Sequence, residues 1–187
     1  MEISLNTPAA TLAEIGTIVD KAHVELHKCY QCGKCTAGCP MADSMDITPR
    51  EVIRHLQLGL LAEVLRCEAV WVCASCHTCS ARCPNEVDVA HLMEVLRQEA
   101  KKRNITPVPD VDKFARIFIS NIRSFGKSHE VVLCASYNVW SGHLFQDVMT
   151  FPHLVMNKLV FFKPHVVKDK TAVRRIMDKA LKGADKA

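Results

Sequence analysis

Eight of the ten cysteines stand in two runs that share one spacing. The first run is Cys29-Tyr-Gln-Cys32-Gly-Lys-Cys35-Thr-Ala-Gly-Cys39-Pro40, and the second is Cys73-Ala-Ser-Cys76-His-Thr-Cys79-Ser-Ala-Arg-Cys83-Pro84. In the spacing C-x2-C-x2-C-x3-C-P, three thiolates bind one [4Fe–4S] cube and the fourth binds a neighbouring cube. Two copies in one chain therefore predict two [4Fe–4S] clusters.

The residues between and after the cysteines suit this chemistry. Two-residue gaps wrap the backbone around a cube and turn N–H groups toward the sulfurs, where hydrogen bonds tune the reduction potential. Gly33 and Gly38 fit such a tight path. Pro40 and Pro84 have no N–H and a fixed φ, so they turn the chain away and carry the preceding cysteine toward the other cube.

The proline that ends each run therefore predicts crossed ligation. We expect one cluster on Cys29, Cys32, Cys35 and Cys83, and the other on Cys73, Cys76, Cys79 and Cys39. This exchange would hold the two cubes side by side, as a path for electrons requires.

Zinc and disulfides are the competing uses of cysteine. A structural zinc site draws two ligands from each of two separated knuckles, whereas each run here packs four cysteines into eleven positions and ends in proline. Disulfides are disfavoured because the start, Met1-Glu-Ile-Ser-Leu-Asn, has no secretory signal pattern. We expect a reducing compartment, the cytoplasm.

Composition excludes two further classes. The formal net charge is +4, but each oxidised cube with four thiolates adds about −2, so the loaded protein is near neutral and nucleic-acid binding gains no support. The run Lys101-Lys102-Arg103 is expected to be a solvated helix end. The most apolar stretch, 151–162, is interrupted by Pro152, His153, Asn157 and Lys158, so no membrane span is predicted.

Helices are predicted around both runs. Apolar residues at helical spacing from Leu12 to Val19 indicate a helix that leads into the first run. Thr48-Pro49-Arg50-Glu51 is a capping box with proline at the first helical position, and it predicts one helix continuing to Leu65. Asp88 is the predicted N-cap of a helix that ends near Asn104.

A cluster loop followed by a helix thus occurs twice, which predicts an all-α fold. Small bacterial ferredoxins carry short strands at these places, whereas capped helices resemble the second half of the iron–sulfur subunits of succinate dehydrogenase and fumarate reductase. We expect a helical lead-in at 1–28, an alpha-helical ferredoxin domain at 29–105 and a C-terminal appendage at 106–187.

The appendage has helical patterns but no ligand motif. One helix is expected from Asp110 or Asp112 to Gly126, and another from its cap at Asp169 to just before Gly183. The stretch 130–145 fits a strand or a helix. Docking to larger subunits and simple completion of the core both remain open as roles.

Several residues near the runs have a functional and a structural interpretation. Cys67 and Cys134 are expected to be buried small hydrophobic residues. His77 is expected to donate a hydrogen bond to sulfur rather than to bind iron. Positive charge on Lys28, Lys34 and Arg82 would raise a cluster potential or serve solubility.

The first run, the Thr48-Pro49-Arg50-Glu51 helix start and Trp71-Val-Cys73-Ala-Ser-Cys76 together resemble the C subunits of the soluble heterodisulfide reductases of methanogenic archaea, over about residues 20–105. The resemblance implies an iron–sulfur subunit that relays electrons from a flavin-containing (FAD) A subunit to a B subunit. The B subunit reduces the coenzyme M–coenzyme B disulfide in methanogenesis. The resemblance also admits a hydrogenase or formate dehydrogenase as a further partner.

The resemblance also bears on catalysis. The disulfide-cleaving subunits of that family carry Cys-Cys-Gly motifs, whereas this chain has no adjacent cysteines, so no catalytic residue is expected on it. Two alternatives remain open. The same relay could serve a fumarate reductase, a glycerol-3-phosphate dehydrogenase or a sulfur-oxidising complex, or the chain could be a zinc-stabilised binding module.

Overall fold

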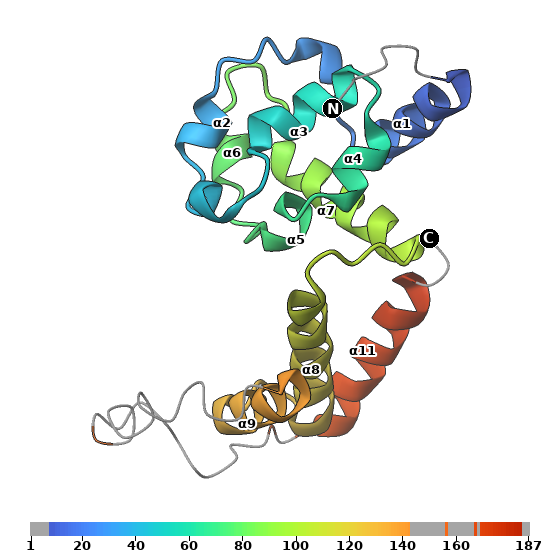
Figure 1. The fold of residues 1–187 in the computed structure, drawn as a ribbon. Coiled ribbons are helices and arrows are strands. Elements are labelled where there is room, and N and C mark those ends of the chain that lie inside the picture. Colours follow the sequence, from blue (N-terminus) through green and yellow to red (C-terminus); the bar gives the residue numbers. More distant parts are fainter. Residues whose placement is uncertain (1–7, 143–155, 157–166, 168, 185–187) are drawn as a thin grey trace. The chain divides into compact units, whose positions relative to one another are not determined.

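The computed structural model describes residues 8–142, 156, 167 and 169–184. The chain forms two compact units, Met1–Val108 and Pro109–Ala187 (Figure 1). Every regular element within the described residues is a helix, so the fold is all-α, as predicted.

The first unit is built around one long helix. Its elements are α1 (Ala9–Lys21), η1 (Leu26–Lys28), α2 (Lys34–Ala37), η2 (Ala42–Ser44), α3 (Pro49–Gln57), α4 (Leu61–Arg66), α5 (Ala69–Val72), α6 (Thr78–Ala81) and α7 (Val89–Lys102). Helices α1, α4, α5 and α6 all pack against α7. The largest fully buried side chains of this unit are Ile53, Leu56, Leu65, Leu92, Met93 and Leu96.

The two cysteine runs fold alike. Apart from η2, which has no counterpart in the second run, the order η1, α2, α3 around the first run is repeated as α5, α6, α7 around the second, and α2 packs against α6. The φ angle is positive at Gln31 (65°) and Gly33 (82°), and again at Ser75 (50°) and His77 (58°). These pairs occupy the same places in the two runs. Residues other than glycine rarely adopt positive φ, and such strain is typical of sites that hold a ligand.

A hydroxyl within each run binds the start of the helix that follows. Thr36 Oγ1 accepts a hydrogen bond from Arg50 N at 3.2 Å, and Ser80 Oγ accepts one from Ala90 N at 3.0 Å. Both N–H groups lie in the first turn of a helix, where no carbonyl of the same helix can accept from them. The run therefore positions the helix that follows it.

The predicted caps at Thr48 and Asp88 are confirmed. Glu51 Oε2 accepts a hydrogen bond from Thr48 N at 2.7 Å and the Thr48 side chain accepts one from Glu51 N, which is the capping-box arrangement; Thr48 Oγ1 also lies 2.8 Å from Glu51 Oε2. The Asp88 side chain accepts a hydrogen bond from His91 N at 3.1 Å at the start of α7.

The prediction of one helix from Pro49 to Leu65 is wrong, because α3 and α4 are separate helices. Gly59 adopts a φ of 78° between them. Its N–H bonds Leu56 O at 3.1 Å, and Leu60 N bonds His55 O at 2.9 Å. This is a Schellman motif, which ends a helix at a left-handed residue. The apolar residues keep a helical spacing on both sides of this break, so the spacing alone predicted one continuous helix.

The second unit contains α8 (Pro109–Phe125), α9 (Glu130–Ser141) and α11 (Lys170–Ala184). Helices α9 and α11 each pack against α8. The stretch that fitted a strand or a helix is α9 as far as Ser141, and 143–145 lie outside the described residues. Asp169 caps α11 by accepting from Ala172 N at 2.9 Å, but the helix continues through Gly183, where it was predicted to end.

The described helices include none that is both long and apolar enough to cross a membrane. The apolar stretch 151–162 considered above lies outside the described residues except for Met156.

Replacing Thr48 with alanine should lower the stability of the first unit. The substitution removes the hydroxyl that bonds Glu51, and loss of such a cap costs about 1 kcal/mol. Thr17→Ala is the matched control, because Thr17 lies inside α1 and bonds only Glu14 O of its own helix, where alanine is the better helix former. Thermal unfolding of the anaerobic, cluster-loaded protein measures both, and equal midpoints for the two variants would contradict the role of this cap.

Candidate iron–sulfur centres

Two pockets in the first unit are each lined by four cysteines. One pocket is lined by Cys29, Cys32, Cys35 and Cys83, and we call it the first pocket. The second pocket is lined by Cys39, Cys73, Cys76 and Cys79. Each pocket therefore takes three cysteines from one run and the last cysteine from the other. These are the two sets named in the crossed assignment.

The thiols follow the same order of exposure in both runs. The second cysteine of each run, Cys32 or Cys76, is exposed, and the third, Cys35 or Cys79, is buried. The first and fourth cysteines of each run are half-buried. Each pocket therefore has one thiol at its back and one at the protein surface.

The buried thiols resist ionisation in the absence of iron. Burial raises the pKa of Cys35, and it raises the pKa of Cys79 to about 11. At the surface, a hydrogen bond with the Thr78 hydroxyl lowers the pKa of Cys76. Iron binds thiolates, so a cluster held by these two buried thiols would have to displace their protons.

The two runs touch where glycine in one faces arginine in the other. Gly38 and Arg82 hold the same place in their runs, directly before the fourth cysteine. A Cβ at Gly38 would lie 2.6 Å from Arg82 Nη1 and 2.7 Å from Arg82 Cδ. The missing side chain at one position thus makes room for the long side chain at the other. Arg82, expected only to flank a run, lies against both.

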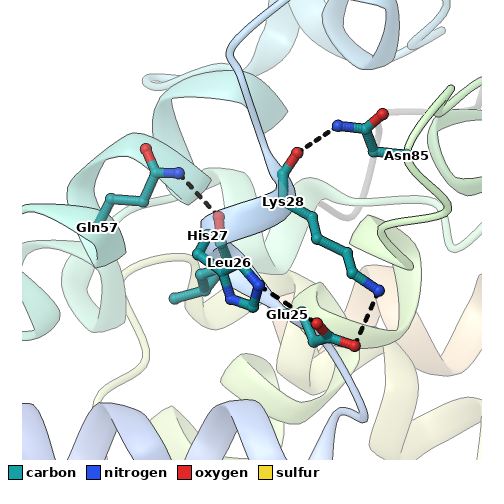
Figure 2. Close-up of polar contacts among 6 residues, drawn as sticks. All are labelled: Glu25, Leu26, His27, Lys28, Gln57 and Asn85. Atoms are coloured by element: carbon teal, nitrogen blue, oxygen red, sulfur yellow. Dashed lines mark hydrogen bonds and ion pairs between the residues drawn. The ribbon is translucent and has the colours of Figure 1, made fainter.

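Further hydrogen bonds tie the end of one run to the start of the other. The Asn85 amide, two residues after Cys83, donates to Lys28 O, the carbonyl just before Cys29 (Figure 2). Val87 N donates to Cys83 Sγ at 3.3 Å, and Gln31 Nε2 donates to Cys29 Sγ at 3.5 Å. These contacts keep Cys83 beside Cys29 and place N–H groups on two sulfurs of the first pocket.

Some of the basic residues near the runs line a pocket and others do not. Lys34 and Arg50 line the first pocket. Lys28 instead pairs with Glu25 on the surface at 2.9 Å (Figure 2). His77 lines the second pocket, but the side chain that reaches Cys76 Sγ there is Thr78, through Oγ1 at 3.4 Å.

The two remaining cysteines differ from each other. Cys67 is buried, as predicted, and lines neither pocket; burial raises its pKa to about 11. The prediction that Cys134 is buried is wrong, because its side chain is exposed. Leu133 is the buried residue of α9, and neighbouring helix positions point about 100° apart.

The cysteine sets suit a cube better than a single ion. Within the part of the chain that the structure describes, no three Cys, His, Asp or Glu side chains are grouped so as to hold one metal ion. The ligands of a cube lie farther apart than those of a single ion, because each of the four thiolates binds a different iron atom. Four cysteines around each pocket supply that number of ligands.

Known proteins resemble this region. Residues 25–87 match the family described as 4Fe-4S dicluster domain. The iron–sulfur C subunit of the CoB–CoM heterodisulfide reductase of Methanopyrus kandleri is 35% identical over 97 residues, which are 49% of this chain and 50% of that protein. The C subunit of the ferredoxin:CoB–CoM heterodisulfide reductase of Methanosarcina acetivorans is 37% identical over 97 residues, 51% of this chain and 39% of that protein.

These matches confirm the resemblance to heterodisulfide reductase C subunits. The chain spans about half the length of the curated relatives it matches. The match of residues 25–87 to a 4Fe-4S dicluster domain agrees with the cysteine runs, and the cofactors of the chain are two [4Fe–4S] clusters.

Anaerobically prepared protein should therefore contain about eight iron and eight acid-labile sulfide per chain, because the two pockets offer two sets of four cysteines, enough for two cubes. Metal analysis and sulfide determination on the full chain measure this content. Stoichiometric zinc without sulfide would contradict the assignment.

Proposed function

We propose that this chain is an electron-transfer subunit of a CoB–CoM heterodisulfide reductase. It relays electrons in the cytoplasm from a flavin-containing, iron–sulfur A subunit to the B subunit that reduces the coenzyme M–coenzyme B disulfide. The observation that carries this proposal is the pair of adjacent cysteine pockets, each reaching the surface at one exposed thiol. The names of the similar proteins support the choice of enzyme.

We assign the clusters by the linings of the pockets. Cluster 1 is held by Cys29, Cys32, Cys35 and Cys83, and cluster 2 by Cys73, Cys76, Cys79 and Cys39. The hydrogen bond from Asn85 to Lys28 O supports the placement of Cys83 with the first run.

The residues of the chain set the route for the electron. When bound, each cube takes up and gives back one electron. Cys32 and Cys76 bring one end of each pocket to the surface, while Cys35 and Cys79 lie inside. Packing of α2 against α6 holds the two pockets together. We assign no catalytic residue, because the chain has no adjacent cysteines that could form a Cys-Cys-Gly motif.

We assign the second unit to docking on larger subunits, which include A and B and, in larger assemblies, a hydrogenase or formate dehydrogenase. Helices α8 and α9 support this role because they expose large apolar side chains, an arrangement typical of interaction surfaces. The exposed residues are Phe114, Phe118, Ile119, Val139 and Trp140.

Replacing Cys39 with serine tests the crossed assignment. Cys39 belongs to the first run but lines the second pocket, so the variant should change the electron paramagnetic resonance signal of cluster 2 and leave that of cluster 1 in place. Cys134→Ser is the control, because Cys134 is exposed and lies in the second unit. The assignment fails if the signal changes match those of a Cys35→Ser variant, in which a ligand of cluster 1 is lost.

The relay itself is tested by turnover. The purified chain should accept electrons from a strong reductant but should not reduce the coenzyme M–coenzyme B disulfide, because disulfide cleavage needs a site that binds the substrate sulfur. Activity should appear when the B subunit is added. Cys76→Ser should block transfer from the A subunit, while a dye that donates directly to B still supports turnover. Appreciable disulfide reduction by the chain alone would show a catalyst instead of a relay.

A further inference from the structure

In each repeat, one side chain of the helix that follows the run donates hydrogen bonds to two backbone carbonyls at the start of the run, and these carbonyls hold equivalent positions in the two repeats. In the first repeat, Gln57 Nε2 donates to Leu26 O at 2.8 Å and to Cys29 O at 3.0 Å; Figure 2 shows the bond to Leu26. In the second repeat, Arg97 Nε donates to Val70 O at 2.8 Å and Arg97 Nη2 donates to Cys73 O at 2.6 Å.

The accepting carbonyls are equivalent. Leu26 stands three residues before Cys29, and Val70 stands three residues before Cys73, the first cysteine of its run. Gln57 ends α3, which packs against η1, and Arg97 lies on α7, which packs against α5. Both side chains are half-buried. Each one fixes the backbone that carries the first cysteine into its pocket, so we call Gln57 and Arg97 the two clamps.

The clamps share a geometry but differ in charge. A guanidinium is charged at every pH at which proteins fold, whereas an amide is neutral. The Arg97 guanidinium contacts the carbonyl of Cys73, a residue that lines the second pocket. A fixed positive charge beside a cluster stabilises the reduced state, because reduction adds negative charge. In the first repeat a cation, Arg54, contacts Gln57 Oε1 at 3.4 Å, but the Arg54 side chain is exposed.

Other charges near the pockets are more accessible to salt. Lys34 and Arg50 line the first pocket, and both are exposed. Glu94, one turn before Arg97 on α7, is exposed and accepts from Gln98. Counter-ions screen exposed charges strongly, over about 3 Å in 1 M salt, and screen half-buried charges much less. Arg97, which is half-buried, is therefore a charge whose effect should persist in concentrated salt, and Asp88, the half-buried anion at the start of α7, is the same in every variant.

We infer that Arg97 is a positioning residue that raises the reduction potential of the cluster on Cys73, Cys76, Cys79 and Cys39, and that Gln57 performs the same clamping in the first repeat without this charge. The inference rests on the cluster assignment of the proposed function. It adds that the two clamps are interchangeable in geometry, so that exchanging arginine for glutamine and glutamine for arginine should move the two cluster potentials in opposite directions.

The test is a redox titration of the anaerobic, cluster-loaded full chain, followed by electron paramagnetic resonance in about 1 M salt. Arg97→Gln should retain both clusters and lower one midpoint. At the original midpoint, the ratio of reduced to oxidised cluster should fall on the order of tenfold, which is about 59 mV for one electron. Gln57→Arg should retain both clusters and raise the other midpoint. Lys102→Gln is the control, because it removes a positive charge from the exposed end of the same helix α7 and should move neither midpoint.

The outcomes separate a tuning role from a structural one. Unchanged midpoints with unchanged iron content would overturn the inference, as would two variants that move the same midpoint. Loss of a cluster in one variant leaves the other variant to decide. Loss in both would also overturn the inference, because an amide and a guanidinium would then not be interchangeable clamps. The titration needs no partner protein, so the expected shifts together with a failed relay assay would reject the proposed function and leave the inference standing.

Discussion

The contact between the two cysteine loops is the constraint on which the first unit depends. Each pocket is lined by the last cysteine of the other run, and α2 packs against α6 to bring the runs together. Gly38 and Arg82, which hold equivalent positions in the two runs, then come into contact. The Arg82 side chain fills the space beside Gly38, so a second long side chain would not fit there. The repeat is consequently symmetric in backbone and asymmetric in side chains at the point of contact.

Hydrogen bonds also connect each cysteine loop to the helix that follows it. The hydroxyls of Thr36 and Ser80, one in each run, accept hydrogen bonds from the first turn of the next helix. A side chain of that helix, Gln57 or Arg97, in turn donates to carbonyls at the start of the run. The loop and the helix therefore position each other, and α7 joins this arrangement to the rest of the core. Because the loops have few apolar residues and strained φ angles at Gln31, Ser75 and His77, we expect cluster binding to supply much of the energy that orders them.

The sequence predicts the parts of this structure that depend on local chemistry. The cysteine spacing indicates the clusters, and the caps at Thr48 and Asp88 begin helices where predicted, because each rests on residues close together in the chain. The break at Gly59 was missed because its apolar neighbours keep one helical spacing on both sides. The clamps could not be found from the sequence, because Gln57 and Arg97 act across 28 and 24 positions and share neither residue type nor distance from their run.

The crossed arrangement of the two cubes is the central claim, and an anaerobic crystal structure with anomalous scattering at the iron edge tests it most directly. The account predicts two iron cubes in the first unit, each bonded to three cysteines of one run and to the last cysteine of the other, with Cys83 on the cube of Cys29 and Cys39 on the cube of Cys73. A cube bonded to all four cysteines of one run, or single metal ions in place of cubes, would contradict it.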